Sequence, residues 1–560
     1  MERSYLNIMI GGHAGQGLVT IGQVLSKALV RNGYSIVVTQ SYQSRIRGGH
    51  NTFVIRASTS EISAPQETLD ILVALDADTV TGHREELSSD GIVIADKDLK
   101  ISNINSLNIP YGELAPDKLF NVVALGSIAS VIGLSEKSVA QALDDHFEKK
   151  DESTIKENRR VLIDTFLWVE KNYSSIHKLA TIENPQSRIM INGNEAIALG
   201  ALQAGVKFCS FYPMTPATSI ALNLAHDARE MGLIVEQAED EIAAINMAIG
   251  AFYAGAPSVV TTSGGGFALM VEGVSLSAMT ETPIVIVVAQ RPGPATGLPT
   301  RTEQADLEFV LHAGHGEFPI AILAPGSIEE CFHLTRRAFD LALRYQGPMF
   351  ILTDQYLADS YRAVKPLDLD NLSQIQPTLK AESVSSFYYR YAITESGVSP
   401  RLIPGMTENL VVVDSDEHTV DGHITEDLSI RKEMVEKRLK KGEGIKKEVI
   451  PPEMDGDDNP DILLISWGST KGAVKEASEI IRSNGIRTST LHFSQVWPLV
   501  SQKFLGYLER AKRVVCVESN ATGQFARLIR RETGFEIENR VLRFDGLPIT
   551  PDYIIGEVNC

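Results

Sequence analysis

The chain has 560 residues, a length that corresponds to about three to four domains. It carries 52 Lys and Arg against 71 Asp and Glu, and its net charge of −19 excludes the basic footprint that nucleic-acid binding requires. Small molecules and other proteins are therefore the expected partners.

Histidines and cysteines are too scattered to predict a metal site. The four cysteines, Cys209, Cys331, Cys516 and Cys560, form no C-x-x-C pair. They indicate buried, reduced thiols in a reducing cytoplasm, and they exclude an iron–sulfur cluster held by this chain alone. The pairs His312/His315 and His418/His423 lack a third ligand. We also expect no membrane partner, because the N-terminus lacks a signal-peptide pattern and no apolar run reaches the roughly 18 residues needed for a span.

The first region, to about residue 175, alternates apolar strands with helices. YLNIMI has a buried-strand pattern, GGHAGQG follows it, and LVTIGQVLSKALVRNG has helical periodicity with a terminal glycine. SIVVTQS, FVIRA, DILVALD, GIVIAD and NVVALGSIASVIG continue the alternation. Gly12, Gly15 and Gly17 are spaced G-x-x-G-x-G, and no acidic residue ends SIVVTQS, so NAD binding is not expected. These glycines are also explained by a tight turn from strand to helix, without any ligand.

The rest of the chain predicts two further α/β regions separated by a connector. From RIMINGNEAIALG to about residue 370, the apolar runs CSFYP, SVVTT, PIVIVVAQ, PIAILAP and PMFILTD indicate a parallel sheet with helices on both faces. Residues 366–458 are polar and highly charged, and they predict a long connector that crosses the surface of the neighbouring domain. Residues 459–560 alternate strands and helices again, which predicts a small parallel α/β unit.

Polar residues gather at the loops of the second region. FYPMTPATSI places Thr215 between two prolines, and EQAEDEIAAINMAIG places Glu239 and Glu241 where a strand ends and a helix begins. TTSGGG puts a glycine run before a helix, and QRPGPATGLPTRTEQ carries Arg291 and Arg301 at its two ends. Taken singly, each has an ordinary explanation: a helix cap, a turn residue or a surface ion pair.

In this order the four tracts resemble the alpha subunit of the 2-oxoacid:ferredoxin oxidoreductases, in the domain that holds the aminopyrimidine half of thiamine diphosphate. GGHAGQG with SYQSRIRGGHNTF resembles the gamma domain of that family, and SWGST, FSQVWPL and VESNATGQFARLIR resemble its transketolase C-terminal-like domain. The resemblance implies a multi-domain α/β protein with a gamma domain at 1–178, a thiamine-binding domain at 188–365, a connector at 366–458 and the C-terminal domain at 459–560. Met214, Ala217 and SRIRGG depart from the family pattern.

The resemblance also implies roles for individual residues. Glu241, favoured over Glu239 by its distance to Gly250, would hold the pyrimidine ring nitrogen, and the Thr215 hydroxyl would lie near the reacting carbon. An arginine would bind the substrate carboxylate, and Arg291 and Arg301 both remain candidates. The implied cofactor-binding residues are Tyr212, Pro213, Thr215, Glu239, Glu241, Ser263, Gly264, Gly265 and Gly266. For coenzyme A they are Gly12, Gly15, Gly17, Arg45 and Arg47, with a structural role at a domain contact as the alternative.

One expected motif is absent. The family holds the cofactor diphosphate through a metal bound by a GDG followed by an Asn pair, and this sequence has neither. The site is therefore expected to be half of one, completed by a beta subunit that brings Mg²⁺, the diphosphate site and a [4Fe-4S] cluster, in an (alpha-beta)2 assembly. The implied reaction is the oxidative decarboxylation of a 2-oxoacid, with coenzyme A as acyl acceptor and ferredoxin as electron acceptor.

The substrate and the class of function stay open at this point. The fused gamma–alpha order and AEDEIAAINMAIG favour 2-oxoglutarate, which would yield succinyl-CoA, and pyruvate and branched-chain 2-oxoacids are alternatives. Two other classes are a non-catalytic assembly or regulatory subunit and a nucleotide-dependent oxidoreductase built on GGHAGQG. The retention of Thr215, Glu241 and both arginines speaks against the first.

Overall fold

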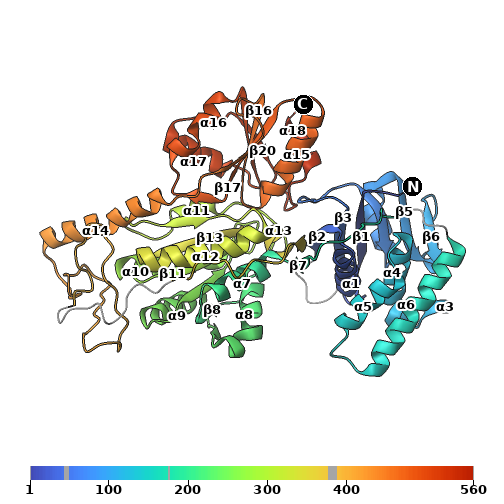
Figure 1. The fold of residues 1–560 in the computed structure, drawn as a ribbon, viewed down its shortest axis with the longest axis horizontal. Helices are drawn as coiled ribbons and strands as arrows, with labels where there is room; N and C mark the ends of the chain where they lie inside the picture. The colour runs from blue at the N-terminus through green and yellow to red at the C-terminus, as the bar shows by residue number, and fades with distance from the viewer. Residues whose placement is uncertain (1, 43–48, 174–176, 376–387, 559–560) are drawn as a thin grey trace. The chain divides into compact units, whose positions relative to one another are not determined.

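The computed structural model describes residues 2–42, 49–173, 177–375 and 388–558, which form two compact units (Figure 1). The first unit comprises residues 1–192, 359–367 and 550–553, and the second comprises 193–358, 368–549 and 554–560. Among the described residues, no helix is both long enough and apolar enough to cross a membrane. The four predicted domain ranges remain predictions.

The first unit is built on one mixed sheet with the order β6-β5-β4-β1-β3-β2-β14-β7. Strand β1 pairs in parallel with β4 and antiparallel with β3. The strands are β1 (Tyr5–His13), β2 (Ser35–Ser41), β3 (His50–Ser58), β4 (Leu69–Ala74), β5 (Leu87–Asp96), β6 (Ser106–Ile109), β7 (Ile189–Ile191) and β14 (Arg362–Val364). The helices are α1 (Leu18–Arg31), α2 (Ala77–His83), α3 (Tyr111–Leu114), α4 (Phe120–Val131), α5 (Glu136–His146) and α6 (Glu152–Asn172).

The apolar run NVVALGSIASVIG forms helix α4, and its residues from Val122 to Val131 are all buried. A helix that is apolar on every side is a core helix. Its sequence has no hydrophobic periodicity that would distinguish it from a buried strand. Helix α1, by contrast, buries Ile21, Leu25 and Leu29 on one face, as its amphipathic pattern predicts.

The second unit contains a seven-stranded sheet with the order β18-β12-β13-β11-β10-β8-β9, parallel except for the β12–β18 pair. Its strands are β8 (Phe208–Phe211), β9 (Ile234–Gln237), β10 (Ser258–Thr262), β11 (Ile284–Gln290), β12 (Ala321–Leu323), β13 (Pro348–Asp354) and β18 (Gln495–Trp497). The helices of this region are α7 (Gly193–Gln203), α8 (Thr218–Met231), α9 (Glu241–Tyr253), α10 (Gly264–Met279), α11 (Leu307–Leu311), α12 (Ile328–Tyr345) and α13 (Gln355–Asp359). Strands β10, β11 and β13 are buried along their full length, as the apolar runs predict.

The C-terminal region of the second unit adds a five-stranded sheet with the order β15-β17-β16-β19-β20. Its strands are β15 (Glu453–Asp455), β16 (Ile462–Trp467), β17 (Thr488–Phe493), β19 (Arg513–Glu518) and β20 (Asn539–Leu542), and its helices are α15 (Lys471–Ser483), α16 (Leu505–Arg510) and α17 (Gln524–Thr533). Helix α18 (Pro551–Val558) follows, and its residues from 554 onward belong to the second unit. Trp467, Phe493 and Phe525 belong to the same apolar core as Ile286 and Phe350. The two sheets of the second unit therefore share one core, and the predicted mixed α/β fold class is confirmed.

The connector carries helix α14 (Leu428–Lys447), which is joined by a buried ion cluster to the region of the seven-stranded sheet. Lys437 Nζ donates to Glu281 Oε1 at 2.6 Å, and Lys441 Nζ lies 2.5 Å from Glu281 Oε2. Arg390 donates to the backbone carbonyls of Thr280 and Glu281. The two lysines and Arg390 hold the pKa of the Glu281 carboxyl down at about 2, against the opposing effect of burial. Local structure in the connector is thus maintained by long-range charge pairing.

Three of the four cysteines, Cys209, Cys331 and Cys516, are buried free thiols, as predicted. Cys560 lies outside the described residues.

Candidate functional site

The junction between β9 and α9 separates the two candidate glutamates. Asp240 caps α9, because its side chain accepts a hydrogen bond from the Ala243 backbone N–H at 2.7 Å. Glu241 is the first residue of the helix and is only 5% exposed, whereas Glu239 is exposed to solvent. The Glu241 carboxylate points toward the start of α10, where its Oε1 would lie 2.6 Å from a Cβ atom added to Gly266.

The glycine run at the start of α10 gives close access to the backbone. Helix α10 has no side-chain cap, and the buried Ser263 Oγ has no hydrogen-bond partner within the described part of the chain. A Cβ atom on Gly264 would collide with the Asp306 carboxylate, and one on Gly265 would lie 3.5 Å from the Met214 side chain. The run therefore brings the 212–217 loop, the segment around Asp306 and Glu241 to the same helix N-terminus.

The loop before α8 meets Arg291. Arg291 Nη1 donates a hydrogen bond to the Thr215 backbone carbonyl at 2.7 Å. Thr215 is half-buried, and Tyr212 and Pro213 are exposed beside it. Residues 212–217 and the end of β11 are therefore joined, although they are far apart in the sequence.

The two arginines that the sequence leaves open have different surroundings. Arg291 is 8% exposed, burial lowers the pKa of its guanidinium, and its Nε has no partner among the described residues. Arg301 packs its side-chain stem on Gly546, and no hydrogen bond or ion pair joins it to Thr215, Glu241 or Ser263 in the described ranges. The geometry thus groups Arg291, and not Arg301, with the other candidate residues.

Asp306 lies beside the candidate residues although the sequence did not single it out, and Glu303 is coupled to it electrostatically. Burial raises the pKa of Asp306 to about 6 against the opposing charge of Arg291, and burial together with Asp306 raises the pKa of Glu303 to about 7. The Oδ2 atom of Asp306 is buried and has no hydrogen-bond partner in the part of the chain that the structure describes. The sequence does show an acidic pair in TRTEQAD, but the contact of Asp306 with Gly264 depends on the fold.

These features fit an aminopyrimidine-type heterocycle. Ser263 Oγ, Arg291 Nε and Asp306 Oδ2 are buried polar atoms with no partner among the described residues. Asp306 lies against Gly264 and Glu241 against Gly266, in the glycine run that follows Ser263. Buried polar groups in folded proteins are ordinarily satisfied, so a concentration of unsatisfied ones indicates a ligand or partner that completes them. No group of His, Cys, Asp and Glu in the described ranges could hold a metal ion.

The predicted coenzyme A residues lie in the first unit. Gly15 and Gly17 have φ of 98° and 76°, and with Gln16 they line a cavity of about 470 Å³ at the end of β1. Asp96, Asp117 and Lys118 also line it, as does Tyr111, whose buried hydroxyl has no partner among the residues described. Gly12 packs on Gln16 and Leu75. Arg45 and Arg47 lie outside the described residues.

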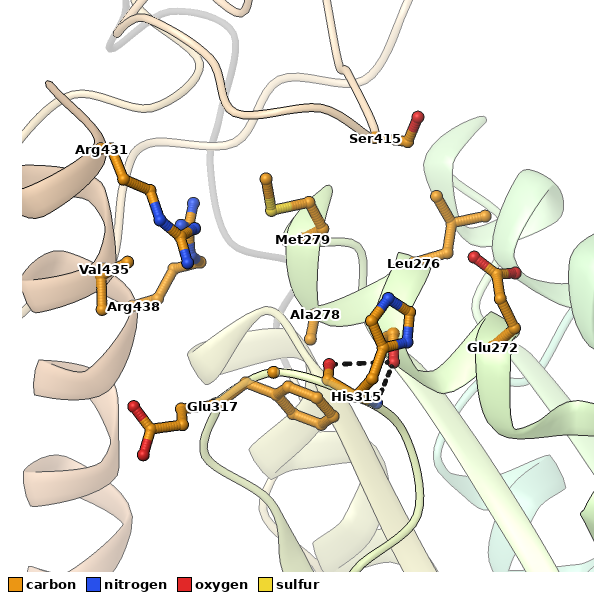
Figure 2. Close-up of a pocket in the computed structure, with 13 residues that line it drawn as sticks. Glu272, Leu276, Ala278, Met279, His315, Glu317, Ser415, Arg431, Val435 and Arg438 are labelled. Carbon is orange, nitrogen blue, oxygen red and sulfur yellow. Dashed lines mark hydrogen bonds between the residues drawn. The ribbon is translucent and has the colours of Figure 1, made fainter. Parts of the chain in front are cut away.

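Figure 2 shows a second cavity, of about 370 Å³, between α10, the 312–318 loop and α14. Arg431 and Arg438 face it from α14, but both are paired with Glu417, and His315 is held through its backbone by Ser275. None of the candidate residues lines this cavity. His312 accepts a hydrogen bond from Arg531, and His418 stacks on Tyr391.

Comparisons with known proteins identify the family. Residues 199–437 match the family described as pyruvate flavodoxin/ferredoxin oxidoreductase, thiamine diP-bdg, and residues 7–167 match the family described as pyruvate ferredoxin/flavodoxin oxidoreductase. The chain is 32% identical to a 2-oxoacid:ferredoxin oxidoreductase subunit alpha from Sulfolobus sp, over 98% of this chain and 95% of that protein. It is 31% identical to the 2-oxoglutarate synthase subunit KorA of Methanothermobacter marburgensis, over 66% of this chain and 97% of that protein.

Among solved structures, the chain resembles the 2-oxoglutarate:ferredoxin oxidoreductase from Magnetococcus marinus with 2-oxoglutarate, coenzyme A and succinyl-CoA bound. The TM-score is 0.94 at 29% identity, and the match covers 100% of this chain and 99% of that one.

Proposed function

The chain belongs to the family of 2-oxoacid:ferredoxin oxidoreductase alpha subunits, which are thiamine-diphosphate-dependent oxidoreductases, and on that premise we propose that its substrate is 2-oxoglutarate. The reaction would convert 2-oxoglutarate and coenzyme A to succinyl-CoA and carbon dioxide, with ferredoxin taking up two electrons. The substrate is supported by the 2-oxoglutarate bound to the Magnetococcus protein and by the KorA relatives. Pyruvate and branched-chain 2-oxoacids are the alternatives.

The observation that carries the proposal is the convergence of Glu241, Thr215 and Arg291 on the N-terminus of α10. When bound, thiamine diphosphate supplies the carbon that joins the oxo group and takes up the electrons left by decarboxylation. The buried Glu241 carboxylate would hold the aminopyrimidine ring nitrogen, with Tyr212, Pro213 and Ser263–Gly266 lining the same half-site. Arg291 would bind the substrate carboxylate, because a guanidinium matches a carboxylate with two parallel hydrogen bonds, and the Thr215 hydroxyl would face the oxo oxygen.

A partner subunit would complete the site. Large apolar side chains lie exposed next to the candidate residues: Ile242 is 52% exposed on α9, Leu269 53% on α10 and Leu298 51% in the loop after β11. Exposed apolar side chains around a polar centre are typical of a protein interface. We propose that a beta subunit covers them and contributes the diphosphate site, Mg²⁺ and a [4Fe-4S] cluster, in an (alpha-beta)2 assembly in the cytoplasm.

Coenzyme A binding to the first unit is a separate part of the proposal. The cavity at Gly15 and Gly17 carries the carboxylates of Asp96 and Asp117 beside Lys118, which is not a phosphate-binding charge pattern. A role in binding the coenzyme A phosphates therefore depends on Arg45 and Arg47, outside the described residues.

The test is a panel of 2-oxoacids on the complex purified after co-expression with the beta subunit. The isolated chain should be colourless and inactive, and the complex should be brown and reduce a viologen acceptor when given 2-oxoglutarate and coenzyme A. Turnover by the isolated chain would contradict the half-site. A higher kcat/KM for pyruvate or a branched-chain 2-oxoacid would replace 2-oxoglutarate as the substrate.

The role of Glu241 is tested against its exposed neighbour. Glu241→Gln should abolish turnover and leave assembly with the beta subunit intact, because an amide does not hold the ring nitrogen as a carboxylate does. Glu239→Gln, a matched change two residues away, should leave turnover unchanged. If Glu239→Gln is the inactive variant, the assignment of Glu241 is wrong. If both complexes turn over normally, neither glutamate has the proposed role.

A further inference from the structure

Residues Thr302–Glu308 are held by the C-terminal region of the second unit. The Thr302 backbone N–H donates to the Gly546 carbonyl at 3.2 Å. The Gln524 side chain donates to the Ala305 carbonyl at 2.7 Å and accepts from the Glu308 backbone N–H at 3.0 Å. The short helix α11 that follows contacts α17 (Figure 1). The conformation of this segment is therefore set by residues more than 200 positions later in the chain.

Gln304 is the centre of these contacts. It is fully buried, and all four of its polar groups are used. Its backbone N–H donates to the Ser519 carbonyl at 2.6 Å, and its Oε1 accepts from the Ser519 N–H at 3.1 Å. Its Nε2 donates to the Trp467 carbonyl at 2.9 Å, and its carbonyl accepts from Asn520 Nδ2 at 3.2 Å.

The C-terminal region provides a glycine where Gln304 fits. Gly468 has a φ of +55°, and a Cβ atom there would lie 2.8 Å from Gln304 Nε2. This is well inside the 3.4 Å at which ordinary van der Waals contact begins. Any larger residue at this position would push the Gln304 amide away from the Trp467 carbonyl.

The same segment reaches the candidate site two residues later. The Asp306 backbone N–H donates to Gln290 Oε1 at 3.0 Å, and Gln290 is the neighbour of Arg291 in the sequence. The Asp306 carboxylate rests on Gly264, at the N-terminus of α10. Hydrogen bonds therefore fix Gln304 to Trp467 and Ser519, and a further hydrogen bond fixes Asp306 to Gln290, the residue beside Arg291. The backbone of Ala305 joins the two sets.

We propose that Gln304 is a positioning residue through which the C-terminal region holds Asp306 and Arg291 in place, and thereby sets the affinity of the site for the 2-oxoacid. The inference rests on the proposed function, because it takes Arg291 to bind the substrate carboxylate. It gives the transketolase C-terminal-like region a part in substrate binding besides packing and assembly. Contacts that position a binding group alike in the bound substrate and in the transition state change KM and leave kcat nearly constant.

The test uses the complex with the beta subunit and measures kcat and KM for 2-oxoglutarate, or for the 2-oxoacid that the panel selects. Gln304→Ala and Gly468→Ala should each raise that KM by roughly tenfold, the effect of weakening about one hydrogen bond between a displaced Arg291 and the substrate carboxylate, with kcat within about twofold of wild type. The KM for coenzyme A and the amount of thiamine diphosphate bound to the complex should not change.

Gly485→Ala is the matched control. Gly485 also lies in the C-terminal region with a left-handed backbone, at φ +88°, but a Cβ atom there meets nothing within 4 Å. It should lower the thermal midpoint only through its left-handed backbone, and so by less than Gly468→Ala, while leaving KM unchanged. If Gly468→Ala and Gly485→Ala have the same KM, or if kcat falls with KM constant, the positioning role is overturned. Should Gln304→Ala not assemble, Gly468→Ala alone decides.

A double-mutant cycle separates this inference from the proposed function. Asp306→Asn should raise KM by itself, and adding Gln304→Ala should raise it no further, because the two residues act in series. If the increases in KM caused by the two substitutions instead multiply in the double variant, Gln304 does not act through Asp306. Arg291→Lys with an unchanged KM would instead refute the role of Arg291, whatever the Gln304 variants do.

Discussion

A single methyl group at Gly266 should disable the cofactor half-site without removing any proposed catalytic group. The Cβ atom of Gly266→Ala would lie 2.6 Å from Glu241 Oε1 and 3.0 Å from Glu241 Cγ. Ordinary contact begins at 3.4 Å, so the carboxylate would have to retreat by about 0.8 Å. Thr262 Oγ1 would lie closer still, at 2.4 Å from the same Cβ atom, so Thr262 must shift as well and it limits the space into which the carboxylate can move.

A displacement of this size has a predictable cost. Misplacing a catalytic group by about 1 Å lowers the rate by on the order of 100-fold. We therefore expect kcat of the assembled Gly266→Ala enzyme to fall by roughly two orders of magnitude, with weaker binding of thiamine diphosphate. The assay is viologen reduction under saturating substrate, together with a titration of the cofactor into the complex.

The chain offers a control within α9 itself. Gly250 is exposed in the helix that begins with Glu241, and a Cβ atom there meets nothing within 4 Å. Gly250→Ala should leave turnover unchanged and stabilise the helix by up to about 1 kcal/mol, because alanine is the better helix former. If Gly266→Ala retains wild-type turnover and cofactor affinity, the Glu241 carboxylate is not the group that the cofactor needs.

Three further outcomes are expected. Arg291→Lys should raise the KM for the 2-oxoacid by roughly 10- to 100-fold, because lysine cannot make the forked contact, and Arg301→Lys should change it less; the reverse order would give the carboxylate to Arg301. Asp306 has a raised pKa of about 6, so between about pH 4 and pH 6 its carboxyl keeps a proton in the folded chain and loses it in the unfolded chain. The contribution of Asp306 to the free energy of unfolding therefore falls as the pH rises through this range. Asp306→Asn should therefore raise the thermal midpoint at pH 8 relative to wild type by more than at pH 4, and equal differences at both pH values would contradict the raised pKa. Glu281→Gln leaves Lys437 and Lys441 buried without their counter-charge and should cost about 3 to 5 kcal/mol in denaturant unfolding, whereas Glu436→Gln, which removes an exposed pair with Lys432, should cost under about 0.5 kcal/mol; similar losses would argue against the buried cluster.

Local sequence patterns predicted most of the secondary structure that carries the site. The apolar runs at β8, β10, β11, β12 and β13 are strands because their flanking glycines and prolines and their branched residues leave little alternative. The run that became α4 could not be assigned in this way, since a residue set that is apolar throughout carries no period. The position of Glu241 at a helix start could be predicted, but Asp240 as the actual cap of that helix was not.

The sequence by itself therefore determined the mixed α/β class, the family and the set of loops that bear polar residues, because these depend on short-range periodicity and on motifs with fixed order. Only the tertiary structure decided which side chains meet. It joined Arg291 to Thr215, seated Asp306 on Gly264, buried Glu281 between two lysines of α14 and enclosed Gln304 with Trp467 and Ser519. Each of these contacts joins segments about 40 to more than 200 positions apart, and their geometry follows from how the two sheets of the second unit share one core, which no local pattern records.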